Sequence, residues 1–216
     1  MKHTSKIIIT LIILISTTLP AEAQFGIKGG INFPNVTAKS RYNNFKIEPQ
    51  DKIGFNIGAF LDVGNAGNLE VTSSLSYVRK QISGRFGFVN PSTSDMAEMS
   101  VDYLVYSLIG KFNVFEMQKL TPYIYFAPRF NVYLSNNYEQ EVQEVPQSTR
   151  NVISNNLTKF GFGVSLGVGT SINTGSRVTP FFEAQFSPDF FNAYDDGYIT
   201  FKSNSFELLA GIRIGK

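Results

Sequence analysis

Eight segments of this chain alternate apolar residues with small or polar ones, and the connectors between the segments are long and short in turn. The clearest segment is residues 160–169, FGFGVSLGVG, in which each apolar residue is followed by Gly or Ser. Successive side chains of a strand point to opposite faces, so one face is apolar and the other is nearly empty. Stretches of about ten alternating residues are typical of a transmembrane β-barrel.

The pattern therefore predicts an all-β fold, an eight-stranded antiparallel up-and-down transmembrane β-barrel. Backbone groups that face hydrocarbon have no water to pair with, so such a sheet must close on itself. In the ambiguous fourth segment we place Tyr106 and Leu108 outward, because Lys111 then turns inward. Pro128 removes a ladder hydrogen bond in the fifth, where we expect a bulge or a kink. The predicted strands are residues 25–33, 53–63, 69–78, 103–114, 123–134, 160–172, 181–188 and 206–214.

The N-terminal 23 residues have the features of a secretory signal peptide. Lys2 and Lys6 precede an apolar run at residues 7–15, and Ala21-Glu22-Ala23 is a small-residue cleavage site. We expect residues 1–23 to be removed and residues 24–216 to form one barrel domain. The chain has no Cys, which excludes a lipid-modified first residue and a disulfide framework.

The connectors predict the orientation in the membrane. Barrels of this type have short periplasmic turns and longer extracellular loops. We therefore expect an outer-membrane protein with both termini in the periplasm. The long connectors are residues 34–52, 79–102, 135–158 and 189–205, and the short ones are 64–68, 115–122 and 173–180.

The sparse face carries charged residues that must be paired if they lie inside a narrow lumen. Arg129 and Glu183 both point inward, and the strand between them offers only Gly and Ser on that face. We predict an Arg129–Glu183 ion pair over this glycine-rich strand, with Glu207 beside it. The full predicted lumen network comprises Arg129, Glu183, Glu207, Lys28, Glu70 and Arg213.

The composition argues against catalysis. The chain's one His is His3, inside the signal peptide, so the mature chain lacks the residues of Ser-His and Cys-His sites and of nearly all zinc sites. We expect no enzyme activity, no cofactor and no metal. Asp195-Asp196-Gly197 fits a turn or a weak calcium contact, of which we favour the turn. Removing Lys2, Lys6 and Glu22 leaves 17 basic and 16 acidic residues, which gives no electrostatic case for nucleic acid.

Several segments resemble the PorT-like outer-membrane β-barrel proteins typical of Bacteroidetes. The resemblance covers essentially the whole mature chain and implies an eight-stranded outer-membrane barrel in a family that largely lacks assigned activities. One member is associated with a secretion system for proteases, but these motifs do not transfer that role. The chain departs from many outer-membrane barrels because it ends on Lys216 and not on an aromatic residue. The matching segments are QFGIKGGINFPNV, YLVYSLIGKFNVF, TPYIYFAPRFNVYLS and FGFGVSLGVG.

The leading hypothesis is an integral outer-membrane barrel with a structural or surface-interaction role through its extracellular loops. Its partners would be outer-membrane lipid and envelope or secretion-system proteins that contact loops such as the acidic residues 138–144. One alternative is a narrow conduit for small solutes or ions. The other is a soluble lipocalin-like ligand-binding barrel, which would keep its apolar face inside.

Overall fold

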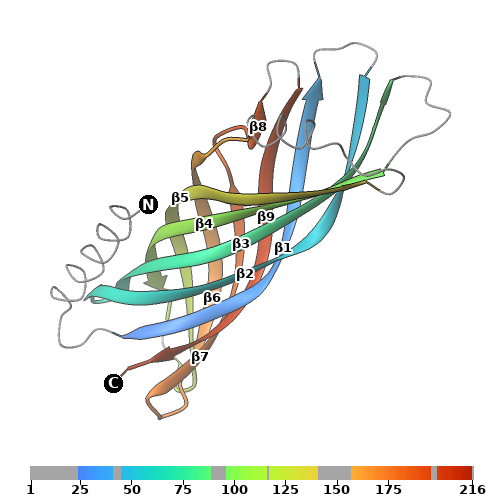
Figure 1. Ribbon diagram of the computed structural model, residues 1–216. Helices are drawn as coiled ribbons and strands as arrows, with labels where there is room; N and C mark the ends of the chain where they lie inside the picture. The colour runs from blue at the N-terminus through green and yellow to red at the C-terminus, as the bar shows by residue number, and fades with distance from the viewer. Residues whose placement is uncertain are drawn as a thin grey trace, which may run out of the picture.

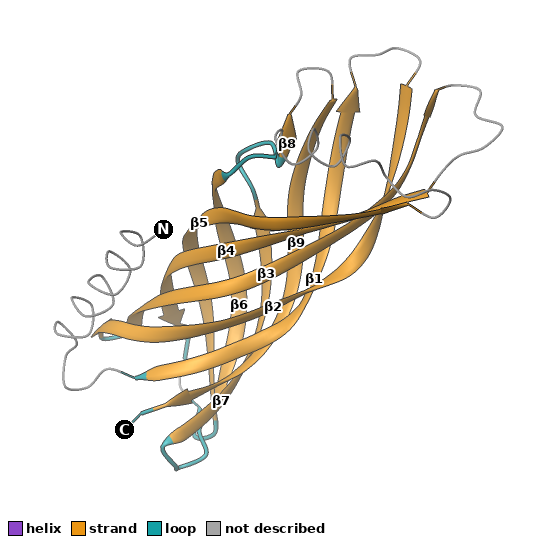
Figure 2. Ribbon diagram, in the orientation of Figure 1, coloured by secondary structure: helices purple, strands orange, loops and turns teal. Residues whose placement is uncertain are grey.

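The computed structural model describes residues 24–40, 45–88, 96–115, 117–140, 157–195 and 199–215. All regular structure in these residues is β-strand (Figure 2). None of them belongs to a helix long and apolar enough to cross a membrane. The predicted signal peptide lies outside the described residues. The strands are β1 (Phe25–Ser40), β2 (Phe45–Ala66), β3 (Leu69–Phe88), β4 (Met96–Asn113), β5 (Leu120–Gln140), β6 (Phe160–Ile172), β7 (Val178–Pro188), β8 (Tyr194–Asp195) and β9 (Ile199–Ile214).

Eight of these strands form a closed antiparallel barrel (Figure 1). Each pairs with the next along the chain, β7 pairs with β9, and β9 closes the sheet by pairing with β1 from Phe25↔Ile214 to Ser40↔Ile199. The remaining strand, β8, is a two-residue addition to β9. The predicted fold class is confirmed.

The two faces of the barrel have the polarity of a membrane protein. Outward apolar side chains are well exposed, for example Ile57 at 59% and Leu75 at 50%, whereas inward polar groups such as Lys111 are buried. Tyr106 and Leu108 point outward, so the choice made for the ambiguous strand is confirmed. The lipocalin-like alternative is wrong, because it requires the opposite orientation.

The start of β1, the end of β9 and the short turns lie at one end of the barrel. Phe25 is opposite Ile214, and two of the turns contain a glycine with positive φ, Gly67 at 63° and Gly175 at 68°. This backbone conformation is nearly free of steric cost only for glycine. The opposite end holds the other ends of six strands (Figure 1), at Ser40, Phe45, Phe88, Met96, Gln140 and Ile199.

At that opposite end the strands continue through most of the predicted long loops. Residues 34–40, 45–52, 79–88, 96–102, 135–140 and 199–205 are strand, so the predicted boundaries are wrong there. The polarity of the two faces reverses on these strand extensions, which begin beyond outward aromatic contacts such as Phe33–Phe206. Inside the barrel the apolar Val36 and Val101 are buried. Outside it the charged Lys39 and Lys202 are exposed. A strand that leaves the lipid no longer shows an apolar outer face, which hides it from the alternation pattern.

β1 and β2 separate where the strand extensions begin. Their ladder ends at Asn32↔Gly54, after which β1 pairs with β9 and β2 pairs with β3. The fully buried Asn32 amide on β1 links the separated strands, because it donates to the backbone oxygens of Arg79 on β3 at 2.8 Å and of Phe55 on β2 at 3.3 Å. Buried carbonyl groups beside a bulge in β2 thus keep a donor.

Of the bulge or kink predicted at Pro128, the bulge is wrong. The β4–β5 ladder is interrupted between Ser107↔Arg129 and Gly110↔Phe126 but resumes in the same register. A register shift occurs instead beside Asp102 and Tyr103. Pro128 lacks the N–H group that a ladder hydrogen bond needs, but no extra residue is inserted into β5 at this point.

Candidate functional site

The lumen is the most distinctive chemical feature of this barrel. Ten charged side chains of the described residues form ion pairs inside it, five cations and five carboxylates. The two signs therefore balance within this set, as a low-dielectric interior requires. The cations are Lys28, Lys80, Lys111, Arg129 and Arg213, and the carboxylates are Asp62, Glu70, Glu183, Asp189 and Glu207.

Arg213 forms the ion-pair cluster at the end that holds the chain termini. Its guanidinium lies 3.1 Å from Asp62 Oδ2 and 3.1 Å from Glu70 Oε2. Thr72 donates to Asp62 at 2.6 Å, and Asn113 donates to Glu70 at 3.0 Å. One cation and two carboxylates are thus tied to strands β2, β3, β4 and β9.

Glu183 is the centre of a second cluster, deeper in the lumen. Lys111 donates to its Oε1 at 2.9 Å, Tyr123 donates to the same atom at 2.9 Å, and Lys28 Nζ lies 4.0 Å from Oε2. The Lys111 ammonium also lies over three aromatic rings, 4.8 Å from Tyr123 and within 5.7 Å of Phe60 and Phe181. Aromatic faces attract cations, so the rings compensate part of the lost hydration of Lys111.

Asp189 is the centre of a third cluster, towards the opposite end. Its carboxylate accepts hydrogen bonds from Lys80 at 2.7 Å, Arg129 at 2.7 Å and Asn131 at 2.9 Å. Only 2% of Asp189 is exposed. One carboxylate therefore joins β3 and β5 to the end of β7.

Glu207 lies between these clusters and is 1% exposed. It accepts a 2.7 Å hydrogen bond from Asn56, and Arg129 Nη1 lies 4.0 Å from its Oε1. Arg129 thus faces two carboxylates, one at each side.

The predicted Arg129–Glu183 pair is wrong, because Arg129 bonds to Asp189 and Glu183 bonds to Lys111. All six residues of the predicted network nevertheless form lumen ion pairs. Sequence reasoning missed Lys80 and Asp189, since both fell in predicted loops. Every second residue of a strand faces the lumen, and counting in twos from the inward Ser76 reaches Lys80, as counting from Ser187 reaches Asp189. This spacing could have identified both residues as inward.

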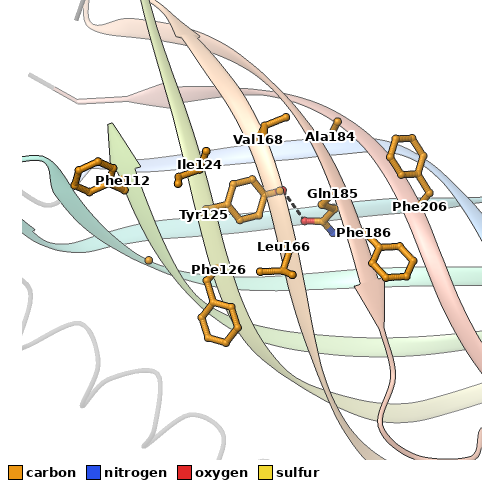
Figure 3. Close-up of a pocket in the computed structure, with 12 residues that line it drawn as sticks. Phe112, Ile124, Tyr125, Phe126, Leu166, Val168, Ala184, Gln185, Phe186 and Phe206 are labelled. Atoms are coloured by element: carbon orange, nitrogen blue, oxygen red, sulfur yellow. Dashed lines mark hydrogen bonds between the residues drawn. The ribbon is translucent and has the colours of Figure 1, made fainter. Parts of the chain in front are cut away.

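Glycines on β6 make room for these contacts. A Cβ atom at Gly169 would lie 2.5 Å from the Tyr123 ring, and one at Gly167 would lie 2.3 Å from the Tyr125 ring. Tyr125 crosses β6 to donate to Gln185 on β7 at 2.8 Å (Figure 3). Long side chains of β5 therefore reach β7 because the strand between them has almost no inward side chains.

The segment that follows β7 covers the lumen on the side of β6. The backbone of Asp189 bridges to Gly163, and Phe191 fills the space over Gly161, where a Cβ would lie 1.9 Å from its ring. Leu157 and Tyr194 form a second bridge, and both are buried. Irregular backbone at residue 157 and at residues 189–194 thus extends the short strands β6 and β7 through isolated bridges.

The lipid-facing side of β5, β6 and β7 carries a groove of about 590 Å³ (Figure 3). Exposed apolar residues such as Phe126, Leu166 and Phe186 line it, together with the small residues Gly110 and Ala184. Its composition is that of the surrounding apolar belt.

A further ion pair lies beyond the belt, where Arg79 donates to both carboxylate oxygens of Asp102 at 2.7 and 2.9 Å. Partial burial by itself raises the pKa of Asp102, but hydrogen bonds from Arg79 and Ser135 outweigh it and hold this pKa below its ordinary value. Asp102 is therefore a fixed anion at neutral pH.

The described residues include no group of three His, Cys, Asp or Glu side chains placed to hold a metal ion. The acidic side chains of residues 138–144 lie outside the described part of the chain, and so do Asp196 and Gly197. The described arrangement holds paired charges inside the lumen.

Comparison with known proteins agrees with the fold. The sequence model of a family described as "Outer membrane protein beta-barrel domain" matches residues 16–195. Among solved structures, the outer membrane protein OprG from Pseudomonas aeruginosa aligns with a TM-score of 0.53 and 9% identity, over 90% of this chain and 97% of OprG. The outer membrane protease OmpT from Escherichia coli aligns with a TM-score of 0.52 and 8% identity, over 91% of this chain and 97% of OmpT. No curated protein sequence matches the chain.

Proposed function

Because the chain belongs to the outer membrane protein β-barrel domain family, we propose that it acts at the cell surface through its extracellular hairpins while its lumen stays closed. It is an outer-membrane β-barrel protein in contact with lipid. The observation that carries the proposal is the set of five cations and five carboxylates inside the lumen, which leaves charge pairs where a channel would need water.

The extended strands support the surface role. Six strand segments continue beyond the apolar belt, and their outward faces carry polar residues such as Lys39 and Lys202. Rigid strands that hold connecting loops away from the membrane are suited to contact with other molecules. Envelope or secretion-system proteins are the proposed partners.

We further propose the orientation, processing and chemistry that go with this role. The termini lie in the periplasm, residues 1–23 are a cleaved signal peptide, and the protein belongs to the PorT-like group. It is not an enzyme. OmpT is a protease, but a likeness of 8% identity concerns the fold alone.

Planar lipid bilayer recording of the refolded protein tests the closed lumen. We expect no stepwise conductance from protein whose folding is verified by faster migration of the unheated sample in a gel. Reproducible single-channel steps would contradict closure. Cross-linking on intact cells tests the surface role, since a variant with a shortened β3–β4 hairpin should lose a partner that the full-length protein captures.

A narrow conduit is the second candidate, favoured by loosely bonded groups in the middle of the lumen. Two ion pairs there, Lys28–Glu183 and Arg129–Glu207, are 4.0 Å long. Glu183 Oε2, Asn56 Oδ1 and Ser205 Oγ are buried without a hydrogen-bond partner among the described residues. Groups of this kind suit water-sized species, and a pH-sensitive dye inside protein-containing vesicles would report proton entry.

A further inference from the structure

Four polar residues form a straight row across β2, β3, β4 and β5. Lys52 is directly opposite Gln81, Gln81 is opposite Ser100, and Ser100 is opposite Asn137. Residues directly opposite in an antiparallel sheet share a face and lie about 5 Å apart at Cβ. The row therefore places an ammonium, two amides and a hydroxyl side by side.

The row faces away from the lumen, immediately beyond the apolar belt. On β3, Gln81 has the parity of Leu75 and Tyr77, and Leu75 is half exposed to lipid. Tyr77 contacts Phe55 with ring centroids 5.7 Å apart, and the Arg79 guanidinium lies 5.6 Å from the Phe55 ring. The row is one step further out than this aromatic pair, at the level of lipid headgroups.

A pocket of about 180 Å³ opens over the row, with Arg79 and Glu98 also in its lining. Its charges are already paired, since Lys52 binds Glu98 and Arg79 binds Asp102. Gln81 and Ser100 make no side-chain hydrogen bond within the part of the chain that the structure describes. The pocket thus offers unused donors and acceptors without a net charge.

We propose that this pocket binds one sugar unit in the headgroup of an outer-leaflet glycolipid. Sugar hydroxyl groups both donate and accept, as do the Gln81 amide and the Ser100 hydroxyl. The paired state of Lys52 and Arg79 disfavours a bare phosphate, which would have to displace a carboxylate. The position at the edge of the belt selects a membrane glycolipid over a soluble glycan, because its acyl chains can lie along Tyr77 and Phe55. The inference rests on the proposed orientation with the hairpins outside the cell.

The test compares binding of rough-type lipopolysaccharide to the full-length protein in phospholipid nanodiscs, counted by native mass spectrometry. The variant Gln81→Ala/Ser100→Ala removes the unused groups. Its matched control is Asn35→Ala/Asn204→Ala, a directly opposite pair on β1 and β9. Loss of two or three hydrogen bonds should weaken binding about tenfold in the first variant and leave the control unchanged.

Equal binding by wild type and the Gln81→Ala/Ser100→Ala variant would overturn the proposal. So would equal occupancy by phosphatidylethanolamine, or equal binding of the deacylated oligosaccharide free in solution, which would place the ligand outside the membrane. Both variants must migrate as folded barrels. Labelling of surface cysteines on cells tests the orientation separately, so a failure of the proposed function is distinguishable from a failure of this site.

Discussion

Tyr123 on β5 donates a 2.9 Å hydrogen bond to Glu183 on β7 although β6 lies between the two strands. The contact is possible because Gly169 leaves the inner surface of β6 bare at that point. Asn56 on β2 reaches Glu207 on β9 in a similar way, with β1 between them. Glycine on one strand therefore decides which side chains of its two neighbours can meet.

Replacing Gly169 by Ala should destabilise the barrel. The new Cβ would lie 2.5 Å from the Tyr123 ring, and overpacking of this kind costs about 1–3 kcal/mol. The urea midpoint, read from the folded band in unheated gels, should fall. Gly64→Ala is the control, since no atom lies within 4 Å of a Cβ there, and equal midpoints for the two variants would contradict the prediction.

Lys111 and Glu183 should behave as a coupled pair. Lys111→Met leaves Glu183 with only the longer ion pair to Lys28, and Glu183→Gln leaves Lys111 without its carboxylate partner. Breaking a buried ion pair by removing one partner costs about 3–5 kcal/mol. The double variant should lose clearly less than the sum of the two, so a double-mutant cycle measured in urea should give a large coupling energy. Simple additivity would show that the 2.9 Å contact contributes little.

Asp189 should hold the lumen closed near the end of β7. Asp189→Asn removes the carboxylate that lies between Lys80 and Arg129, so the two cations repel each other and only Glu207 remains near Arg129. A single Ser187→Cys, at a fully buried position in a chain without other cysteines, should resist a maleimide in the wild-type background and react at least about tenfold faster with Asp189→Asn. Ser176→Cys, on an exposed turn, should react equally in both backgrounds.

The proposed orientation predicts which cysteines are reachable from outside an intact cell. Thr37→Cys, on the outward face of β1, should be labelled by a membrane-impermeant maleimide. Ser176→Cys lies on a turn at the end that holds the termini and should be labelled only after the outer membrane is permeabilised. The reverse pattern would place the hairpins in the periplasm.

The Arg79–Asp102 pair should depend on pH with a definite sign. The pKa of Asp102 is lower in the folded protein than its ordinary value of 3.8, so the pair contributes stability above that value and loses it as the pH falls through the lowered pKa. Arg79→Gln should move the Asp102 pKa upward in a carboxyl NMR titration. A titration that is the same in wild type and variant would exclude this cause.

The alternation of the chain was sufficient to assign faces but not to find all of the strands. Within lipid, one apolar face is obligatory, and so the parity of Tyr106, Leu108 and Lys111 followed from the pattern. Beyond the lipid the requirement reverses, as Val36 inside and Lys39 outside illustrate. The strand extensions therefore looked like loops.

The closed eight-stranded barrel and the inward position of Arg129, Glu183 and the other predicted lumen charges follow from the residue pattern alone, because periodicity and the cost of exposed polar backbone in lipid act residue by residue. The pairing of Arg129 with Asp189 and of Glu183 with Lys111 is visible in the folded barrel alone. Those partners depend on how far each strand is staggered around the barrel, and on the glycines that let side chains pass across a strand. Stagger is a property of the closed sheet, and no single strand contains it.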